Sequence, residues 1–378
     1  MEIGPVLQVL FGLVLLVGGG DLLVRGAAGL ATAARISPLV IGLTVVAFGT
    51  SSPELAVSIN SARQGSAELA LGNVIGSNIC NVLLILGLSA LIAPLVVASS
   101  VVRRDVPLMI VLSGLTLVLA WDGAIGSWDG VVLFFGVVVY TAYSFIQGRK
   151  EARLAVGSSQ RAEQSEQSTN ISHSTWLRFG LLIALAVGGL ALLTFGANLL
   201  VEGSVVIARN YEVSELVIGL TILAVGTSLP ELATSVIAGL RGQTDIAVGN
   251  IVGSNIFNVC CVLGVCGLMA PQQGINVSPA AIRFDIPLMI AVAVACLPVF
   301  FTGGLISRWE GGLFLFFYAA YMVHLILEAT QHPSHRTFLA VMLEFVAPLA
   351  AITLGIGLYR HFRRARKKSG QTLGSEKL

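Results

Sequence analysis

Long apolar runs dominate this chain and leave few folds open to it. Runs of about 20 residues, the length that crosses the core of a bilayer as a helix, recur along the sequence. Of the 378 residues, 55% are hydrophobic and 11% are charged, whereas soluble domains carry about 25% charged residues. The runs lack the alternation of a barrel strand, and a helix satisfies its own backbone in lipid. The sequence therefore predicts an all-α polytopic membrane protein.

We expect ten spans in two sets of five, followed by an eleventh. The first set, within residues 1–147, covers 5–24, 38–62, 69–93, 105–121 and 129–147. The second set, within residues 177–330, covers 177–200, 214–240, 246–270, 285–302 and 311–330. The stretch 148–176 between them is rich in Ser, Gln and Glu, which predicts a flexible linker too short for a regulatory domain. An extra span at 337–359 precedes a basic tail at 360–378.

The distribution of basic residues predicts the orientation. With the N-terminus outside, the linker and tail are cytoplasmic and 18 of the 22 Lys and Arg residues lie inside. Cytoplasmic loops carry such an excess. The eleventh span is needed for this arrangement, because without it the linker and tail would lie on opposite sides. We therefore expect a multi-pass protein of the cell (plasma or inner) membrane.

The two halves of the chain repeat each other. Residues 37–65, SPLVIGLTVVAFGTSSPELAVSINSARQG, match residues 214–242, SELVIGLTILAVGTSLPELATSVIAGLRG. The match continues without a gap at an offset of 177 residues, and RRDVPLMI from Arg103 pairs with RFDIPLMI from Arg283 after a slip of three. Five spans are an odd number, so the second half enters from the opposite side. Inverted repeats are typical of secondary transporters, whose site lies where the repeats meet; a duplicated scaffold without transport is the alternative.

Each half carries a carboxylate inside an apolar span. Glu54 ends the segment GTSSPE and Glu231 ends GTSLPE. A charge at mid-span costs about 2.5–3.5 kcal/mol on insertion scales, so it normally faces a cavity or a partner. The preceding proline lacks an N–H and interrupts the helix, which frees backbone carbonyls as oxygen ligands. The adjoining hydroxyls are those of Thr50, Ser51, Thr227 and Ser228.

The next span of each half carries a polar stripe. Asn73, Ser77 and Asn81 follow a spacing of four, and their counterparts are Asn250, Ser254 and Asn258. Gly72 and Gly76 should allow close helix approach. Interhelical hydrogen bonding explains any one of these polar residues, but duplication around two glutamates favours a binding site.

The pooled ligands are hard oxygens, which suit Na+, Ca2+ or Mg2+. Ca2+ accepts six to eight oxygens in flexible geometry, whereas Mg2+ demands a strict octahedron. Two ionised glutamates balance one divalent cation, and several Na+ ions can compete for the same oxygens. The five cysteines lie in apolar stretches, His173 lies in the linker and His324 stands by itself in span 10. We therefore expect neither a zinc site nor an intramembrane enzyme.

These paired segments resemble the α-repeats of the Ca2+/cation antiporter superfamily, in its prokaryotic Na+/Ca2+ exchanger branch. The resemblance implies a diamond of sites from spans 2, 3, 7 and 8, with Glu54 and Glu231 as the main Ca2+ ligands beside the carbonyls of Thr50 and Thr227. It also implies that spans 1 and 6 slide as a gating bundle. Positions that match the remaining sites are Ala47, Ser77, Ala224 and Ser254 for Na+, and Asn81 and Asn258 for the central pair.

The expected function is therefore Na+/Ca2+ antiport, with Ca2+, Na+ and the lipid bilayer as partners. We expect no cofactor, no nucleic acid and no obligatory protein partner. Some members of the superfamily carry Asp where this chain has Asn258, so the stoichiometry and any K+ dependence stay open. H+/Ca2+ exchange is the nearest alternative, because two apposed glutamates can also carry protons. A channel is less favoured, because broken helices in inverted repeats indicate alternating access.

Overall fold

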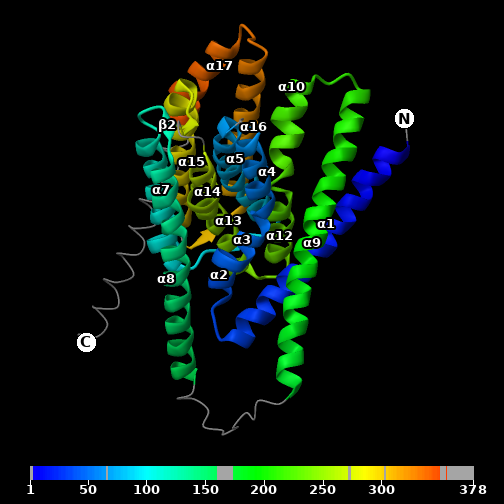
Figure 1. Ribbon diagram of the computed structural model, residues 1–378, viewed down its shortest axis with the longest axis vertical. Helices are drawn as coiled ribbons and strands as arrows, with labels where there is room; N and C mark the ends of the chain where they lie inside the picture. The colour runs from blue at the N-terminus through cyan, green and yellow to red at the C-terminus, as the bar shows by residue number, and fades with distance from the viewer. Residues whose placement is uncertain are drawn as a thin grey trace, which may run out of the picture.

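The described chain is almost entirely helical. The computed structural model describes residues 3–64, 67–159, 173–270, 274–301, 304–349 and 355 (Figure 1). Within them, seven helices are long and apolar enough to cross a membrane, and a bent pair makes an eighth. The prediction of an all-α membrane protein is confirmed at this level.

The elements of the first half follow one another in this order. They are α1 (Ile3–Ala34), α2 (Pro38–Ile41), η1 (Gly42–Val46), α3 (Ala47–Thr50), α4 (Ser52–Arg63), α5 (Ala67–Cys80), η2 (Asn81–Leu86), α6 (Gly87–Ile92), β1 (Leu95–Val96), η3 (Val101–Asp105), α7 (Val106–Leu119), β2 (Ala124–Ile125) and α8 (Ser127–Ser159), where η marks a π-helical turn.

The second half repeats the same order from α9 onward. Its elements are α9 (His173–Asn210), α10 (Glu215–Ile218), η4 (Gly219–Leu223), α11 (Ala224–Gly226), α12 (Leu229–Leu240), α13 (Thr244–Phe257), η5 (Asn258–Leu263), α14 (Gly264–Met269), β3 (Ile275–Asn276), η6 (Ala281–Asp285), α15 (Ile286–Phe301), β4 (Leu305–Ile306) and α16 (Arg308–Ala329). Beyond this repeat lie α17 (His335–Val341) and η7 (Met342–Val346).

Helices extend into both ends of the segment 148–176, which is expected to be a linker. α8 continues to Ser159, and α9 already begins at His173. Residues 160–172, most of the eleventh segment beyond 349, and the tail at 360–378 lie outside the described residues. The start of the eleventh segment is helical through α17 and η7.

Two antiparallel strand pairs connect the halves. β1 pairs with β4, and β2 pairs with β3. In the repeat, β1 corresponds to β3 and β2 to β4, so exchanging the two halves converts one pair into the other. The structure therefore carries the internal symmetry that the sequence repeat predicts.

The two helices that begin the halves cross each other along a line of glycines. Gly12, Gly19 and Gly26 on α1 correspond, at the offset of 177, to Gly189, Gly196 and Gly203 on α9. A Cβ added at Gly12 would come within 2.7 Å of the Gly196 carbonyl oxygen, and one at Gly19 within 2.8 Å of that of Gly189. Residue numbers rise along α1 as those of their partners fall along α9. The two helices are therefore antiparallel and pack backbone to backbone (Figure 1).

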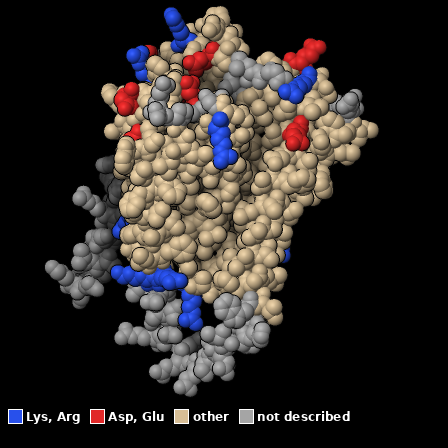
Figure 2. All heavy atoms as spheres, in the orientation of Figure 1, with Lys and Arg blue, Asp and Glu red and all other residues tan. Residues whose placement is uncertain are grey.

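The core lies in the middle of the molecule, and the outer faces are apolar. In the most apolar 18-residue stretch of each span, 72% of the residues are buried in span 68–92 and 89% in span 244–269. The corresponding share in α1 is 28%. Large side chains are exposed on the outer helices, among them Phe11, Phe135 and Leu181. Figure 2 shows that charged side chains on the visible face gather mostly toward the two ends. This is the surface expected for a protein whose sides face lipid.

Candidate ion-binding site

The helix that carries each glutamate is broken directly before it. α3 ends at Thr50 and α4 begins at Ser52, and the axis bends by 41° between them. Pro53 stands in the first turn of α4, where a missing N–H costs nothing. Pro230 has the same place in α12. Each break puts its glutamate in the first turn of a new helix, where the helix dipole favours negative charge.

The two glutamates are held by hydroxyls from the opposite repeat. Ser51 Oγ donates to Glu231 Oε1 at 3.0 Å, and Ser228 Oγ donates to Glu54 Oε1 at 3.2 Å. Both glutamates are fully buried. The Ser228 hydroxyl also lies 3.4 Å from Ser77 Oγ, while Thr50 and Ser254 lie beside Glu231. The structure thus brings these predicted residues together at the interface of the two repeats.

Four amide and carboxylate oxygens of this cluster are buried without a hydrogen-bond partner. They are Glu54 Oε2, Glu231 Oε2, Asn81 Oδ1 and Asn258 Oδ1. A buried polar atom left unpaired costs about 1–3 kcal/mol. The cost is avoided when a cation takes these oxygens as ligands, and neither glutamate forms an ion pair among the described residues. Carboxylate and amide oxygens are the ligands that Ca2+ and Na+ accept.

A second layer of amides orients Asn81 and Asn258, and sequence reasoning did not assign it. Asn81 Nδ2 donates to Asn255 Oδ1 at 3.1 Å, and Asn258 Nδ2 donates to Asn78 Oδ1 at 3.2 Å. Asn255 and Asn78 are oriented in turn by the sulfurs of Met109 and Met289. With their amide nitrogens engaged, Asn81 and Asn258 keep their oxygens available. The duplicated GSN segments and the paired Met109 and Met289 were the signal available in the sequence.

Asn73 and Asn250 support the helices that follow the breaks. Asn73 Nδ2 donates to the Glu54 carbonyl at 3.3 Å and to Ser58 Oγ at 3.0 Å. Asn250 repeats both contacts with the Glu231 carbonyl, at 3.4 Å, and Ser235 Oγ, at 3.0 Å. These two residues therefore fix the glutamate-bearing helices through the backbone, and their amide nitrogens face that backbone.

Corresponding residues of the two repeats differ in exposure. Ala47 and Thr50 are completely buried, whereas Ala224 is exposed and Thr227 is half-buried. Thr50 Oγ1 lies 3.0 Å from Asn250 Oδ1, but Thr227 Oγ1 has no hydrogen-bond partner. The duplicated residues therefore occupy different environments, and α11 is the more exposed of the two corresponding segments.

Glycine packing shows the same asymmetry. A Cβ added at Gly253 would come within 2.6 Å of the Leu43 carbonyl oxygen, and one at Gly249 within 2.9 Å of that of Leu39. Their counterparts Gly76 and Gly72 have nothing within 4 Å. The expected close approach of Gly72 and Gly76 to a neighbouring helix is therefore wrong for this conformation, and only the second repeat's glycines make it.

His324 does not stand by itself, and that expectation is wrong. His335 Nε2 lies 2.9 Å from His324 Nδ1. The two residues are 11 positions apart and belong to different helices, so helical spacing gave no sign that they would meet.

The repeat, the broken helices and the buried carboxylates define a secondary transporter of cations. The chain belongs to the sodium/calcium exchanger protein family, whose model matches residues 4–146 and 181–327. It is therefore a member of a cation/Ca2+ antiporter family, a class of transporters rather than of enzymes. For the family, Ca2+ and Na+ are transported ligands.

Individual relatives cover most of the chain. It is 40% identical to the putative antiporter CaxA of Alkalimonas amylolytica, over 83% of this chain and 96% of the relative. It is 34% identical to the sodium/calcium exchanger MaX1 of Methanosarcina acetivorans, over 84% and 97%. A solved structure of the sodium-calcium exchanger NCX_Mj, soaked with Na+ and without Ca2+, matches with a TM-score of 0.71 and 30% identity, over 85% of this chain and 99% of that chain.

Proposed function

We propose that the protein exchanges Na+ for Ca2+ across the membrane by alternating access. The reciprocal pairs Ser51–Glu231 and Ser228–Glu54 carry this proposal, because each leaves the second oxygen of its carboxylate available in a buried site. Two carboxylates balance one Ca2+, and the neighbouring asparagine oxygens add uncharged ligands. Na+ ions that take the same oxygens would displace Ca2+, and this competition at one site is what exchange requires.

The proposed layout is ten spans in two inverted repeats plus an eleventh, with the N-terminus outside. The site lies between spans 2, 3, 7 and 8, which correspond to α2–α4, α5–α6, α10–α12 and α13–α14. In this orientation the more exposed side of the site, at α11, faces outward. Exposed Ala224 against buried Ala47 supports an outward-facing conformation. In the inward-facing conformation the two repeats would exchange these environments.

The coupling ion is tested by 45Ca2+ uptake into vesicles that contain the purified protein. An outward Na+ gradient at equal pH and equal K+ should drive uptake. Glu54→Gln and Glu231→Gln should each abolish uptake, while the exposed Glu202→Gln serves as the matched control. Uptake that ignores Na+ would overturn the proposal. If uptake follows a pH gradient instead, H+/Ca2+ exchange is the function.

K+ coupling is distinguished in the same vesicles. Uptake that requires K+ together with Na+ would indicate a K+-coupled exchanger. We expect no such requirement. The two carboxylates of this site balance one Ca2+, and the amides of Asn81 and Asn258 add no charge for a K+ ion.

A further inference from the structure

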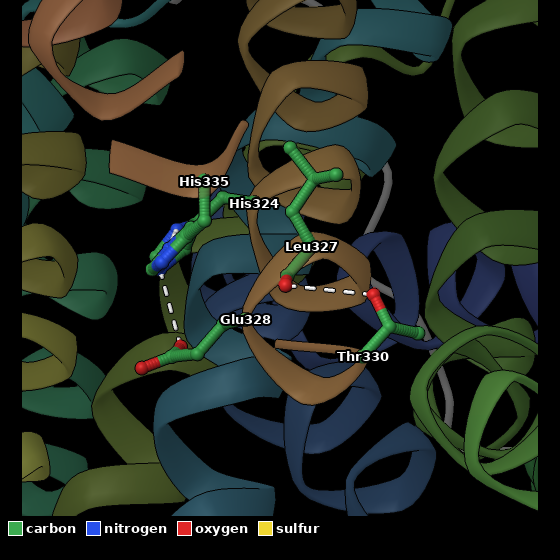
Figure 3. Close-up of polar contacts among 5 residues, drawn as sticks. All are labelled: His324, Leu327, Glu328, Thr330 and His335. Carbon is green, nitrogen blue, oxygen red and sulfur yellow. Dashed lines mark hydrogen bonds and ion pairs between the residues drawn. The ribbon is translucent and has the colours of Figure 1, made fainter. Parts of the chain in front are cut away.

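Three metal-binding side chains gather where α16 ends and α17 begins. His324 and Glu328 lie one turn apart on α16, and His335 is the first residue of α17 (Figure 3). His335 Nε2 lies 2.9 Å from His324 Nδ1, and His324 Nε2 lies 3.5 Å from Glu328 Oε2. One ligand atom from each residue falls within 4.8 Å of the other two. The cluster lies at the end of the molecule opposite the end of α8 and the start of α9, away from the ion-binding site (Figure 1).

The central histidine is buried and incompletely satisfied. His324 is 4% exposed, and its Nε2 has no hydrogen-bond partner although it faces the Glu328 carboxylate. Phe284 packs against the ring with centroids 4.4 Å apart, and the His335 ring stacks on it at 4.9 Å. The ring is therefore held in place with a ring nitrogen directed into the cluster.

The ligand types identify the class of ion. Imidazole nitrogens suit Zn2+ and its neighbours in the transition series, whereas Ca2+ and Na+ prefer an all-oxygen shell. Tetrahedral Zn2+ with bonds of about 2.0–2.1 Å places its ligand atoms about 3.3–3.4 Å apart. The His324–Glu328 separation of 3.5 Å already fits. His335 also offers a ligand atom within 4.8 Å of the other two. Its Nε2 now contacts His324 Nδ1, so the His335 ring must turn for the third ligand to reach that distance.

α17 and η7 form one continuous helix at the edge of the molecule. None of the described residues from His335 to Val346 is fully buried. A bond from His335, the first residue of this helix, to α16 would attach its start to the ten-span body.

We propose that His324, Glu328 and His335 form a Zn2+ site that attaches α17 to the end of α16. The three side chains supply three ligands, and water completes the tetrahedron. The site gives the start of the eleventh segment a defined attachment to the ten-span body. The Zn2+ site is separate from the ion-binding site between the repeats and does not depend on the proposed exchange of Na+ for Ca2+.

Zn2+ binding to the full-length protein in detergent tests this site. After chelator treatment and exchange into Ca2+-containing buffer, calorimetric titration with Zn2+ should show one site per chain. His324→Gln and His335→Gln should each raise the Kd at least about tenfold. His332→Gln is the matched control, because His332 is exposed in the same turn and lies outside the cluster.

Two further measurements separate the site from its alternatives. Zn2+ binding should persist in a Glu54→Gln, Glu231→Gln double variant. X-ray absorption spectroscopy at the zinc edge should report nitrogen and oxygen ligands without sulfur. Size-exclusion profiles check that the histidine variants stay folded. The proposal is overturned if the wild type binds no Zn2+, if His335→Gln binds as tightly as the wild type, or if only the glutamate variant loses binding.

Discussion

The Ser51 hydroxyl donates to the Glu231 carboxylate at 3.0 Å across the boundary between the two repeats. The symmetry-related contact, from Ser228 to Glu54, has nearly the same length at 3.2 Å. Each half of the molecule thus orients the carboxylate of the other. Neither half contains a complete site, which explains why the duplicated motif must act as a pair.

Ser51→Ala should weaken Ca2+ binding without abolishing transport. One hydrogen bond contributes about 0.5–1.5 kcal/mol net, which corresponds to about a 2- to 10-fold loss of apparent affinity. Ser52→Ala is the matched control, because the exposed Ser52 hydroxyl donates to the Phe48 carbonyl of the same span and not to a glutamate. Initial rates of 45Ca2+ uptake over a range of Ca2+ concentrations measure the effect. Equal losses in both variants would contradict the assigned role of Ser51.

Asn258→Asp should change cation preference while Ca2+ binding is retained. The substitution adds a third carboxylate where Asn258 Oδ1 is now uncharged and has no partner. It also places an oxygen against Asn78 Oδ1, which now accepts from the Asn258 amide. Inhibition of Ca2+ uptake by Na+ and by K+ should therefore differ from wild type. Asn81→Asp provides the symmetry-related comparison, and unchanged profiles in both would count against ligand roles for these residues.

Gly253→Ala should lower stability, whereas Gly76→Ala should slow transport at unchanged stability. The added methyl at Gly253 meets the Leu43 carbonyl oxygen at 2.6 Å, so this variant should lower the melting temperature of the purified protein. The methyl at Gly76 meets nothing within 4 Å here, so stability should be kept. Gly76 would become crowded only when the repeats exchange environments, so Gly76→Ala should still slow transport. Normal transport by a stable Gly76→Ala variant would argue against that exchange.

An ion pair links α1 to the core on one side. Asp21 pairs with Arg241, at the end of α12, and with Arg25 at 2.9 Å. The corresponding positions in the other half are Asn198, Gln64 and Glu202, which cannot form the same cluster. The pair should therefore favour the conformation that is closed near Ala47 and open near Ala224.

Thiol labelling measures this bias. An impermeant maleimide should label Ala224→Cys quickly and Ala47→Cys slowly, because Ala224 is exposed and Ala47 is buried. The native cysteines are all buried and should add little background labelling. Adding Arg241→Gln should speed labelling of Ala47→Cys by up to about fivefold, since exposed ion pairs contribute up to about 1 kcal/mol. Arg63→Gln, at the end of α4, is the control and should leave the rate unchanged.

The sequence predicted the repeat, the helix breaks at Pro53 and Pro230, and the meeting of Glu54 and Glu231 with hydroxyls and amides. Those features follow from local chemistry that is duplicated. The environments of Gly76 and Gly253 could not be predicted, because nearly identical segments take different positions relative to their neighbours in the two halves. The contact between His324 and His335 depends on the turn at Gln331, which adopts positive φ, and on the return of α17.

The central claim is that Glu54 and Glu231 together hold a Ca2+ ion that Na+ displaces. Equilibrium binding of 45Ca2+ to the purified protein tests this claim directly. We predict one Ca2+ per chain, displaced by Na+, and lost in Glu54→Gln and in Glu231→Gln but kept in Glu202→Gln. Ca2+ binding that survives either glutamate substitution, or that Na+ leaves unchanged, would contradict the account.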